Sequence, residues 1–165
     1  MRFAVLTLIC MFLFSACNES EHSEIYNENN TTVVDGVVYN TDEKPINGLY
    51  KTYYSNGNVK MEVYSQNGKP NGAGKFYNEK GILQFEGTFA DGLRVGTFYH
   101  YYNNGNVHNE MHFTDGVLDG IQQTFNKKGE LTAEVVYKKG VAVQGYAVVN
   151  GEKQDFTAEE LAHFE

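Results

Sequence analysis

The chain has 165 residues, with 13 basic and 21 acidic side chains and a formal net charge of −8. This length suits a single domain, and a hydrophobic content of 41% supports a folded core. The acidic balance excludes recognition of nucleic acid through a basic face, so we expect no nucleic-acid partner. With 17 glycines, 2 prolines, 12 tyrosines and 11 phenylalanines, the composition favours many short strands joined by tight turns.

Residues 1–16 have the pattern of an export signal. Arg2 is followed by an apolar run over 3–14, which as a helix spans about 18 Å and is too short for a hydrocarbon core of about 30 Å. The next residues, Phe14-Ser15-Ala16-Cys17, resemble a bacterial lipoprotein box, although that box prefers Leu where Phe14 stands. The alternatives are an ordinary cleaved signal and a retained anchor helix.

The lipoprotein resemblance implies that Cys17 is the lipidated N-terminus of the mature protein. The membrane is then one partner, through the lipid, and the location is the bacterial cell envelope, at the periplasmic or surface face of the outer membrane. Cys10 lies in the removed segment, so the mature chain has no thiol for a disulfide, a metal or a nucleophile. Residues 17–31 are polar, acidic and aperiodic, and we expect a disordered tether there.

The body, residues 32–151, is a repeat with a period of 24 residues. Three glycine columns keep this step: 48, 72, 96 and 120; 57, 81, 105 and 129; 68, 92, 116 and 140. An aromatic column (53, 77, 101, 125), an aliphatic column (59, 83, 107, 131) and a glutamate column (62, 86, 110, 134) share the register. Because the period is even, equivalent residues keep the same strand face in every repeat.

Each repeat is predicted to be one β-hairpin. In the first, strands over 49–54 and 59–64 flank a turn at Ser55-Asn56-Gly57-Asn58, where Gly57 requires a positive φ. A second turn follows each hairpin, at positions such as Asn67-Gly68 and Asp91-Gly92. The second strands of the later repeats have an aromatic residue at 89, 113 and 137. Tyr64 lies one position before the equivalent place in the first repeat, which indicates a bulge or a fraying edge.

The ends of the body are predicted to be caps. A leading strand or partial repeat is expected over 33–39, and a last strand over 146–149. Residues 152–165 form the C-terminal cap, in which Thr157-Ala158-Glu159-Glu160 matches a capping box and predicts a short helix over 157–164. The predicted fold is therefore all-β: an elongated repeat sheet of consecutive antiparallel hairpins with a short C-terminal helix.

The hairpin motifs resemble a known repeat family. Its pattern is seen at Asp35-Gly36-Val37-Val38-Tyr39, at 44–48, at 53–60 and at 101–105, and the resemblance covers roughly 33–151. These motifs resemble the variant MORN repeat (membrane occupation and recognition nexus), whose bacterial branch is labelled YwqK-type antitoxin-like. The resemblance implies a row of hairpins in one long, twisted sheet, and scaffold, dimerisation or membrane-proximal binding roles in place of catalysis.

Catalytic and metal-binding patterns are weak in this sequence. No nucleophile motif or phosphate loop is present, so we expect no catalytic residues and no cofactor. The glutamates of the column repeat two strands apart, at about 9.5 Å, which is too far to share one ion, and we expect them to face solvent with cross-strand polar partners. A metal-assisted hydrolase centred on His100, His108 and Glu110 is the least favoured alternative, and we expect no metal site.

The aromatic residues of the first strands are the best candidates for a binding surface. We expect the column at 53, 77, 101 and 125 to pack in the core, and we predict Tyr54, Tyr99, His100 and Tyr102 as partner-binding residues. The predicted function is a membrane-anchored, non-catalytic module that presents an extended surface to a protein or glycan. The alternatives are an antitoxin or immunity-type protein that neutralises a toxin, and a spacer or scaffold that self-associates through its sheet edges.

Overall fold

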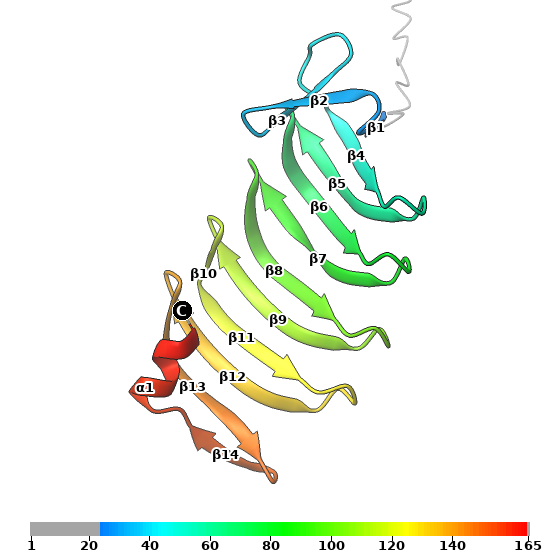
Figure 1. Ribbon diagram of the computed structural model, residues 1–165. Helices are drawn as coiled ribbons and strands as arrows, with labels where there is room; N and C mark the ends of the chain where they lie inside the picture. The colour runs from blue at the N-terminus through cyan, green and yellow to red at the C-terminus, as the bar shows by residue number, and fades with distance from the viewer. Residues whose placement is uncertain (1–23, 165) are drawn as a thin grey trace, which may run out of the picture.

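The computed structural model describes residues 24–164 and is dominated by β-strands (Figure 1). One short helix, α1 (Ala158–Leu161), and a 3-10 turn at Ala162–Phe164 follow the last strand. In chain order the strands are β1 (Ile25–Asn27), β2 (Thr31–Val34), β3 (Val37–Asn40), β4 (Gly48–Tyr53), β5 (Val59–Gln66), β6 (Lys69–Tyr77), β7 (Leu83–Ala90), β8 (Leu93–Tyr101), β9 (Val107–Thr114), β10 (Val117–Leu118), β11 (Gly120–Phe125), β12 (Leu131–Lys138), β13 (Val141–Val149) and β14 (Glu152–Asp155).

Twelve strands form one sheet in which neighbours in sequence are neighbours in space. The order is β1-β4-β5-β6-β7-β8-β9-β11-β12-β13-β14, and β10 pairs with β9. All pairings are antiparallel except that of β1 with β4, which is parallel. The all-β repeat sheet of consecutive hairpins is therefore confirmed, with one hairpin per 24-residue repeat.

The two-residue turns explain one glycine column. Asn67-Gly68, Asp91-Gly92, Asp115-Gly116 and Lys139-Gly140 each place both residues at positive φ, with values from 48° to 87°. This is the type I′ geometry, whose twist matches that of the flanking strands. The glycine N–H of each turn also donates to a carbonyl of the preceding repeat, as Gly92 does to Pro70 at 2.8 Å. The turns therefore join hairpins as well as strands.

The N-terminal cap is a hairpin, at the place where a leading strand or a partial repeat was expected over 33–39. β2 and β3 form a separate two-stranded sheet, because Asp35 and Gly36 both adopt positive φ and reverse the chain between them. This hairpin crosses the start of the large sheet (Figure 1) and is held to it by Val38 N–H, which donates to the Gly68 carbonyl at 2.8 Å.

The C-terminal part of the segment 17–31, which was expected to be a disordered tether, is ordered and contains strand residues. Ile25–Asn27 form β1, and Thr31 already belongs to β2. Tyr26 lies in the core and its hydroxyl donates to Glu24, so an aromatic anchor fixes a segment that its polar composition had assigned to coil. Cys17, the predicted signal peptide and the rest of the tether lie outside the described residues.

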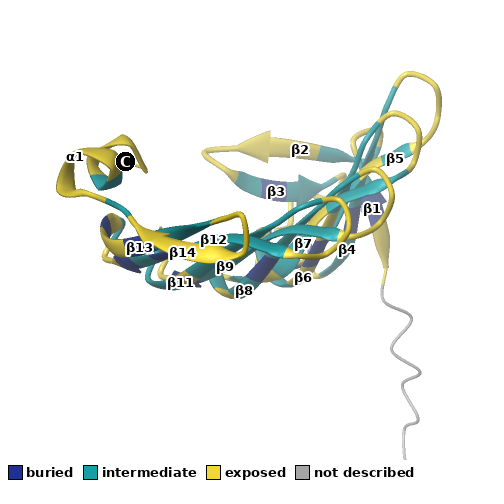
Figure 2. Ribbon diagram, turned by 90° about the horizontal axis from the view of Figure 1, so that it is seen from below, coloured by how far each residue is buried: buried dark blue, intermediate teal, exposed yellow. Residues whose placement is uncertain are grey.

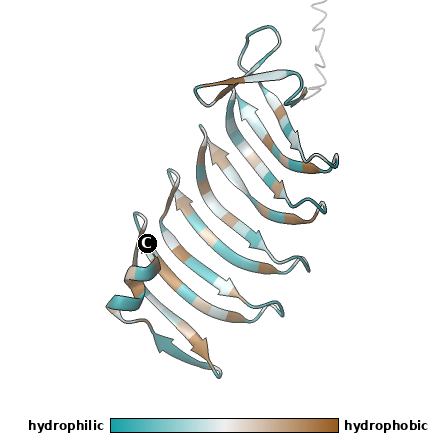
Figure 3. Cartoon of the chain, viewed as in Figure 1, coloured by the Kyte–Doolittle hydropathy of each residue, from teal (hydrophilic) through white to brown (hydrophobic). Residues whose placement is uncertain are grey.

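The two faces of the large sheet differ in chemistry, as the alternating hydropathy along its strands shows (Figure 3). We call them the core face and the polar face. The core face has the buried side chains of Tyr50, Val63, Phe98, Phe113, Val135 and Tyr137. The polar face has the glutamate column, because each glutamate precedes or follows a core-face residue by one position.

Aromatic rings run across the middle of the core face from strand to strand. The ring centroids of Phe76 and Phe89 are 6.2 Å apart, and those of Phe89 and Phe98, and of Phe98 and Phe113, are 5.3 Å apart, with edge-on packing at the last two. Arg94 covers the end of this row, with its guanidinium carbon 4.0 Å from the Phe113 ring centroid. The sheet therefore buries these rings against one another without a second layer.

Caps cover the core face at both ends and lie on the same side of the sheet (Figure 2). At the N-terminal end, Val38 and Ile46 pack with Tyr50 and Val63. At the C-terminal end, Phe156 and Leu161 pack against a cluster that includes Val135, Tyr137 and Ala142.

The C-terminal cap over 152–165 contains a strand as well as the short helix that was expected over 157–164. The capping box is confirmed, with Thr157 as N-cap and Glu160 as its partner. However, Glu152–Asp155 form β14, which closes the sheet. Within residues 24–164, no helix is long and apolar enough to cross a membrane.

Close approach of strands makes one glycine indispensable for packing. A methyl group at Gly87 would lie 2.5 Å from the buried Phe98 ring. We expect Gly87→Ala to lower the free energy of unfolding by about 1–3 kcal/mol through overpacking, measured by urea denaturation. Thr88→Ala, at the exposed next position, is the control and should cost less than about 0.5 kcal/mol. Equal losses for the two variants would show that the Phe98 contact is not the cause.

Candidate functional site

Four rings form a continuous stack on the core face between the two caps; we call it the ring stack. Phe85 and His100 are direct cross-strand partners on β7 and β8, and their rings lie parallel at 4.3 Å. The His100 and His108 rings are 5.0 Å apart, and His108 lies 4.3 Å from the Tyr102 ring. Phe85 is 40% exposed, and the other three rings are partly buried.

A bulge brings His108 into the stack. On β8 and β9, His100 pairs with Asn109 but Tyr101 pairs with Val107, so His108 is the extra residue. Its ring is thereby placed beside His100 and Tyr102. Burial, followed by the nearby His100 ring, lowers the pKa of His108, so its neutral form is favoured in the stack.

The four predicted partner-binding residues are divided by the structure. His100 and Tyr102 both belong to the ring stack. Tyr99 lies on the polar face, paired with Glu110, and Tyr54 lies two hairpins away, at the turn after β4. Phe85 and His108 complete the surface; sequence analysis placed neither in it, because their proximity depends on cross-strand register and on the bulge.

The hydroxyls of Tyr54 and Tyr102 have structural bonds to the next hairpin. They donate to the carbonyls of Tyr77 and Phe125, at 2.7 and 2.9 Å. Asparagines of the same turns do likewise: Asn104 and Asn106 donate to the Lys127 carbonyl at 2.9 and 2.8 Å. The hydroxyl bond thus fixes the outer end of the Tyr102 side chain, while its ring lies against His108.

The expectation that the aromatic column at 53, 77, 101 and 125 packs in the core is wrong. The bulge of each hairpin lies on its second strand, so on the first strand these residues continue the alternation of the polar face. There the Tyr77 hydroxyl donates to Glu62 at 2.8 Å and the Tyr101 hydroxyl to Glu86 at 2.5 Å. Burial and then the Glu62 bond raise the pKa of Tyr77 to about 12, and the same bond lowers the pKa of Glu62. Three members of the glutamate column, Glu62, Glu86 and Glu134, have cross-strand polar partners, as expected.

The residues of the metal-hydrolase alternative do not converge. His100 is on the core face, and Glu110 is on the polar face opposite Tyr99. Among residues 24–164, no group of three or more His, Cys, Asp and Glu side chains is placed to hold a metal ion.

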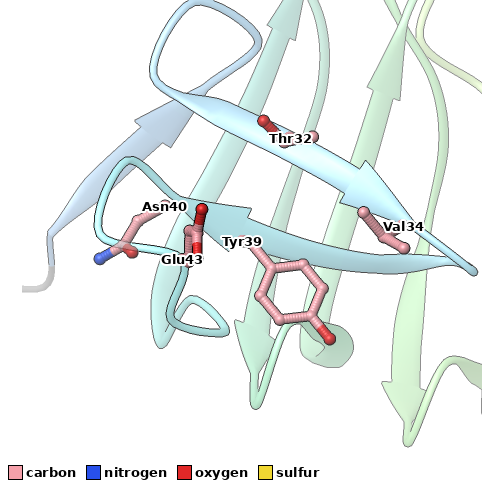
Figure 4. Close-up of a pocket in the computed structure, with 5 residues that line it drawn as sticks. All are labelled: Thr32, Val34, Tyr39, Asn40 and Glu43. Carbon is pink, nitrogen blue, oxygen red and sulfur yellow. The ribbon is translucent and has the colours of Figure 1, made fainter.

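Hollows on the described surface are small and open. One of about 370 Å³ lies on the β2–β3 hairpin and is lined by Thr32, Val34, Tyr39, Asn40 and Glu43 (Figure 4). None of its lining residues belongs to the predicted surface. Another, of about 530 Å³, adjoins the ring stack and is lined by Tyr102, Asn103, Asn104 and Lys127.

One sheet layer of stacked hairpins, each joined to the next by equivalent turns, defines an extended β-repeat protein. The family described as MORN repeat variant matches three consecutive segments, residues 46–67, 70–91 and 94–115. Each segment contains one hairpin, β4–β5, β6–β7 or β8–β9. These three segments are MORN repeat variants, as the sequence motifs predicted.

Two solved structures of protein complexes have low similarity to this chain. One is described as the Glycosylation Associate Protein (Gap123) complex from Streptococcus agalactiae, with 15% identity, 70% of this chain and 20% of that chain covered, and a TM-score of 0.39. The other, accessory secretory protein 1, 2 and 3 in Streptococcus pneumoniae, has 17% identity, 87% and 26% coverage, and a TM-score of 0.40. The chain spans about a fifth to a quarter of those proteins. No curated protein matches it.

Acid should weaken the fold through His108. The pKa of His108 in the folded protein lies below the ordinary value of 6.5, so below pH 6.5 the unfolded chain binds a proton more readily than the folded one. The stability contributed by neutral His108 is therefore complete above pH 6.5 and is lost as the pH falls from 6.5 to the folded pKa. We expect His108→Gln, the residue found at the equivalent position 84, to reduce the loss of stability between about pH 7.5 and 5. Thermal unfolding across pH measures this effect. Identical pH profiles for both proteins would contradict it.

Proposed function

We propose that this protein is a membrane-anchored, non-catalytic binding module that uses the middle of its core face to hold a protein or glycan partner. The observation that carries this proposal is the ring stack of Phe85, His100, His108 and Tyr102. It joins three rings on β7, β8 and β9 with the Tyr102 ring directly after β8, on a face that the two caps leave uncovered.

The composition of the stack suits a binding surface. Aromatic residues are enriched in the cores of protein interfaces, and they bury large areas at low cost in side-chain entropy. Here the rings are already ordered by mutual stacking and by the Tyr102 hydroxyl bond, so little further ordering is needed on binding. The polar turn residues around the adjoining hollow provide hydrogen-bond donors and acceptors at the rim.

A partner across this face is favoured over self-association through sheet edges. The C-terminal edge strand, β14, consists of Glu152, Lys153, Gln154 and Asp155, all exposed. Charged residues on a short edge strand disfavour pairing with another sheet. At the other edge, three-residue β1 pairs with β4 and leaves little length for addition.

Cross-linking in the native cell tests the binding surface. A photoreactive phenylalanine analogue at Phe85 should give a discrete cross-linked species, which His108→Ala reduces at least several-fold because the stack is interrupted. The same analogue at Ile121, which is 44% exposed and lies on the polar face, is the matched control. If the cross-linked partner is a toxin, the immunity role is favoured, and if it is a second copy of the chain, the scaffold role is favoured. No product from position 85, or equal products from both positions, would contradict the proposal.

The anchor is a separate part of the proposal and rests on the sequence. Cys17 follows an apolar run and two small residues, and this is the pattern of lipid attachment. We expect Cys17→Ala to abolish incorporation of a labelled fatty acid and to move the processed chain out of the membrane fraction. Ser15→Thr, which keeps the cysteine, is the control. Unchanged labelling of the Cys17→Ala variant would exclude this residue as the attachment site.

A further inference from the structure

We propose that Glu110, Phe125 and Lys128 form a second site, on the polar face, that binds a ring hydroxyl of a saccharide. This site lies on the side of the sheet opposite the ring stack and goes beyond the function proposed above.

The repeat itself shows what is missing at Glu110. In the two preceding repeats a tyrosine hydroxyl donates to the glutamate fifteen positions earlier, Tyr77 to Glu62 at 2.8 Å and Tyr101 to Glu86 at 2.5 Å. The next member of this tyrosine column is Phe125, which has no hydroxyl. Glu110 therefore lacks the donor that its equivalents receive.

Glu110 also has no lysine directly opposite it on a neighbouring strand, unlike Glu62 and Glu86. Lys51 lies 3.1 Å from Glu62, and Lys75 lies 4.0 Å from Glu86. The cross-strand neighbours of Glu110 are Tyr99 and Gln123, and the Gln123 amide donates to Glu134 at 2.9 Å instead.

The remaining neighbour, His112, gives Glu110 no donor when its ring is neutral. Its Nδ1 lies 2.8 Å from the Ile121 carbonyl oxygen, which can only accept, so Nδ1 has the proton. Nε2, 4.0 Å from Glu110 Oε1, then presents a lone pair. Within residues 24–164, the Glu110 carboxylate thus keeps its capacity to accept a hydrogen bond from a ligand.

The surroundings of Glu110 suit a hydroxylated ring. It opens into a hollow of about 300 Å³ lined by Asn106, Val107, Glu110, Phe125, Lys128 and Gly129. Phe125 and Val107 provide an apolar wall for the carbon face of a sugar ring. A sugar hydroxyl both donates and accepts, so it can donate to Glu110 and accept from the Lys128 ammonium. A cationic peptide side chain would instead meet the charge of Lys128, which disfavours a basic protein partner here.

The test uses the full mature chain in lipid nanodiscs and an array of neutral and N-acetylated oligosaccharides. We expect at least one oligosaccharide to bind, and Phe125→Tyr to weaken that binding at least tenfold, because its hydroxyl takes the place of the ligand against Glu110. The variant should unfold at a higher temperature than the wild type, since it adds the bond found in the other repeats. Loss of binding therefore cannot be assigned to misfolding.

Two matched variants separate this site from the rest of the protein. Tyr101→Phe removes an equivalent bond one repeat earlier and should lower the unfolding temperature without changing saccharide affinity. Ile121→Ala shortens an exposed side chain on the same face, outside the hollow, and should also leave that affinity unchanged, so a loss of binding with Phe125→Tyr is specific to the hollow. The inference is overturned if no oligosaccharide binds, if Phe125→Tyr binds as well as the wild type, or if only a peptide competes for the hollow.

Discussion

The structure depends on one constraint: a sheet of a single layer has to bury its apolar side chains without a second layer to cover them. The long strands meet it by stacking rings from one hairpin to the next, as Phe89, Phe98 and Phe113 do at 5.3 Å spacings. Glycines at 74 and 87 leave room on the same face for these rings. Each hairpin therefore depends on its neighbours to bury its rings, and the ends require caps.

That constraint also explains where function can arise. The β2–β3 hairpin and α1 cover only the two ends of the core face (Figure 2). Between them Phe98 and Phe113 are buried by their neighbours, but Phe85 stays 40% exposed. A repeat that places rings for stability thus provides an aromatic surface as a consequence. Departures from the repeat then make particular places distinct. His108 stands where other repeats have Lys60, Gln84 and Thr132, and Phe125 stands where the three preceding repeats have tyrosine.

The sequence predicted much of the fold because its signals are local and periodic. Glycine spacing gave the hairpin length, and Asn-Gly and Asp-Gly pairs gave the turns, which the positive φ values confirm. Tyr64 indeed lies at a bulge between β5 and β6. The faces were harder to predict, since a bulge on the second strand of each hairpin interrupts the alternation there. The aliphatic column at 59, 83, 107 and 131 therefore lies with the aromatic column on the polar face, where Tyr77 and Tyr101 contact the glutamates. β1 was missed because a parallel pairing over three residues has no periodic signal.

The candidate sites show the same limit. Tyr102 and His100 could be selected by residue type, but Phe85 and His108 join them only through register and a bulge. The missing tyrosine donor at Glu110 has a sequence signal, the change from tyrosine to phenylalanine at position 125. Its consequence for Glu110 can be recognised only from the Tyr–Glu bonds of the structure. Local patterns thus fix the elements, whereas pairing across strands fixes the chemistry.

The central claim is that the middle of the core face is occupied in the cell, and cysteine accessibility tests it most directly. The only natural cysteines are Cys10 and Cys17, so a single Phe85→Cys or Ile121→Cys substitution adds a unique thiol beyond the predicted lipid attachment site. The account predicts that a maleimide reagent labels both positions in the purified protein, but that only position 85 is protected in intact cells. Equal labelling of position 85 in cells and in the purified protein would contradict it.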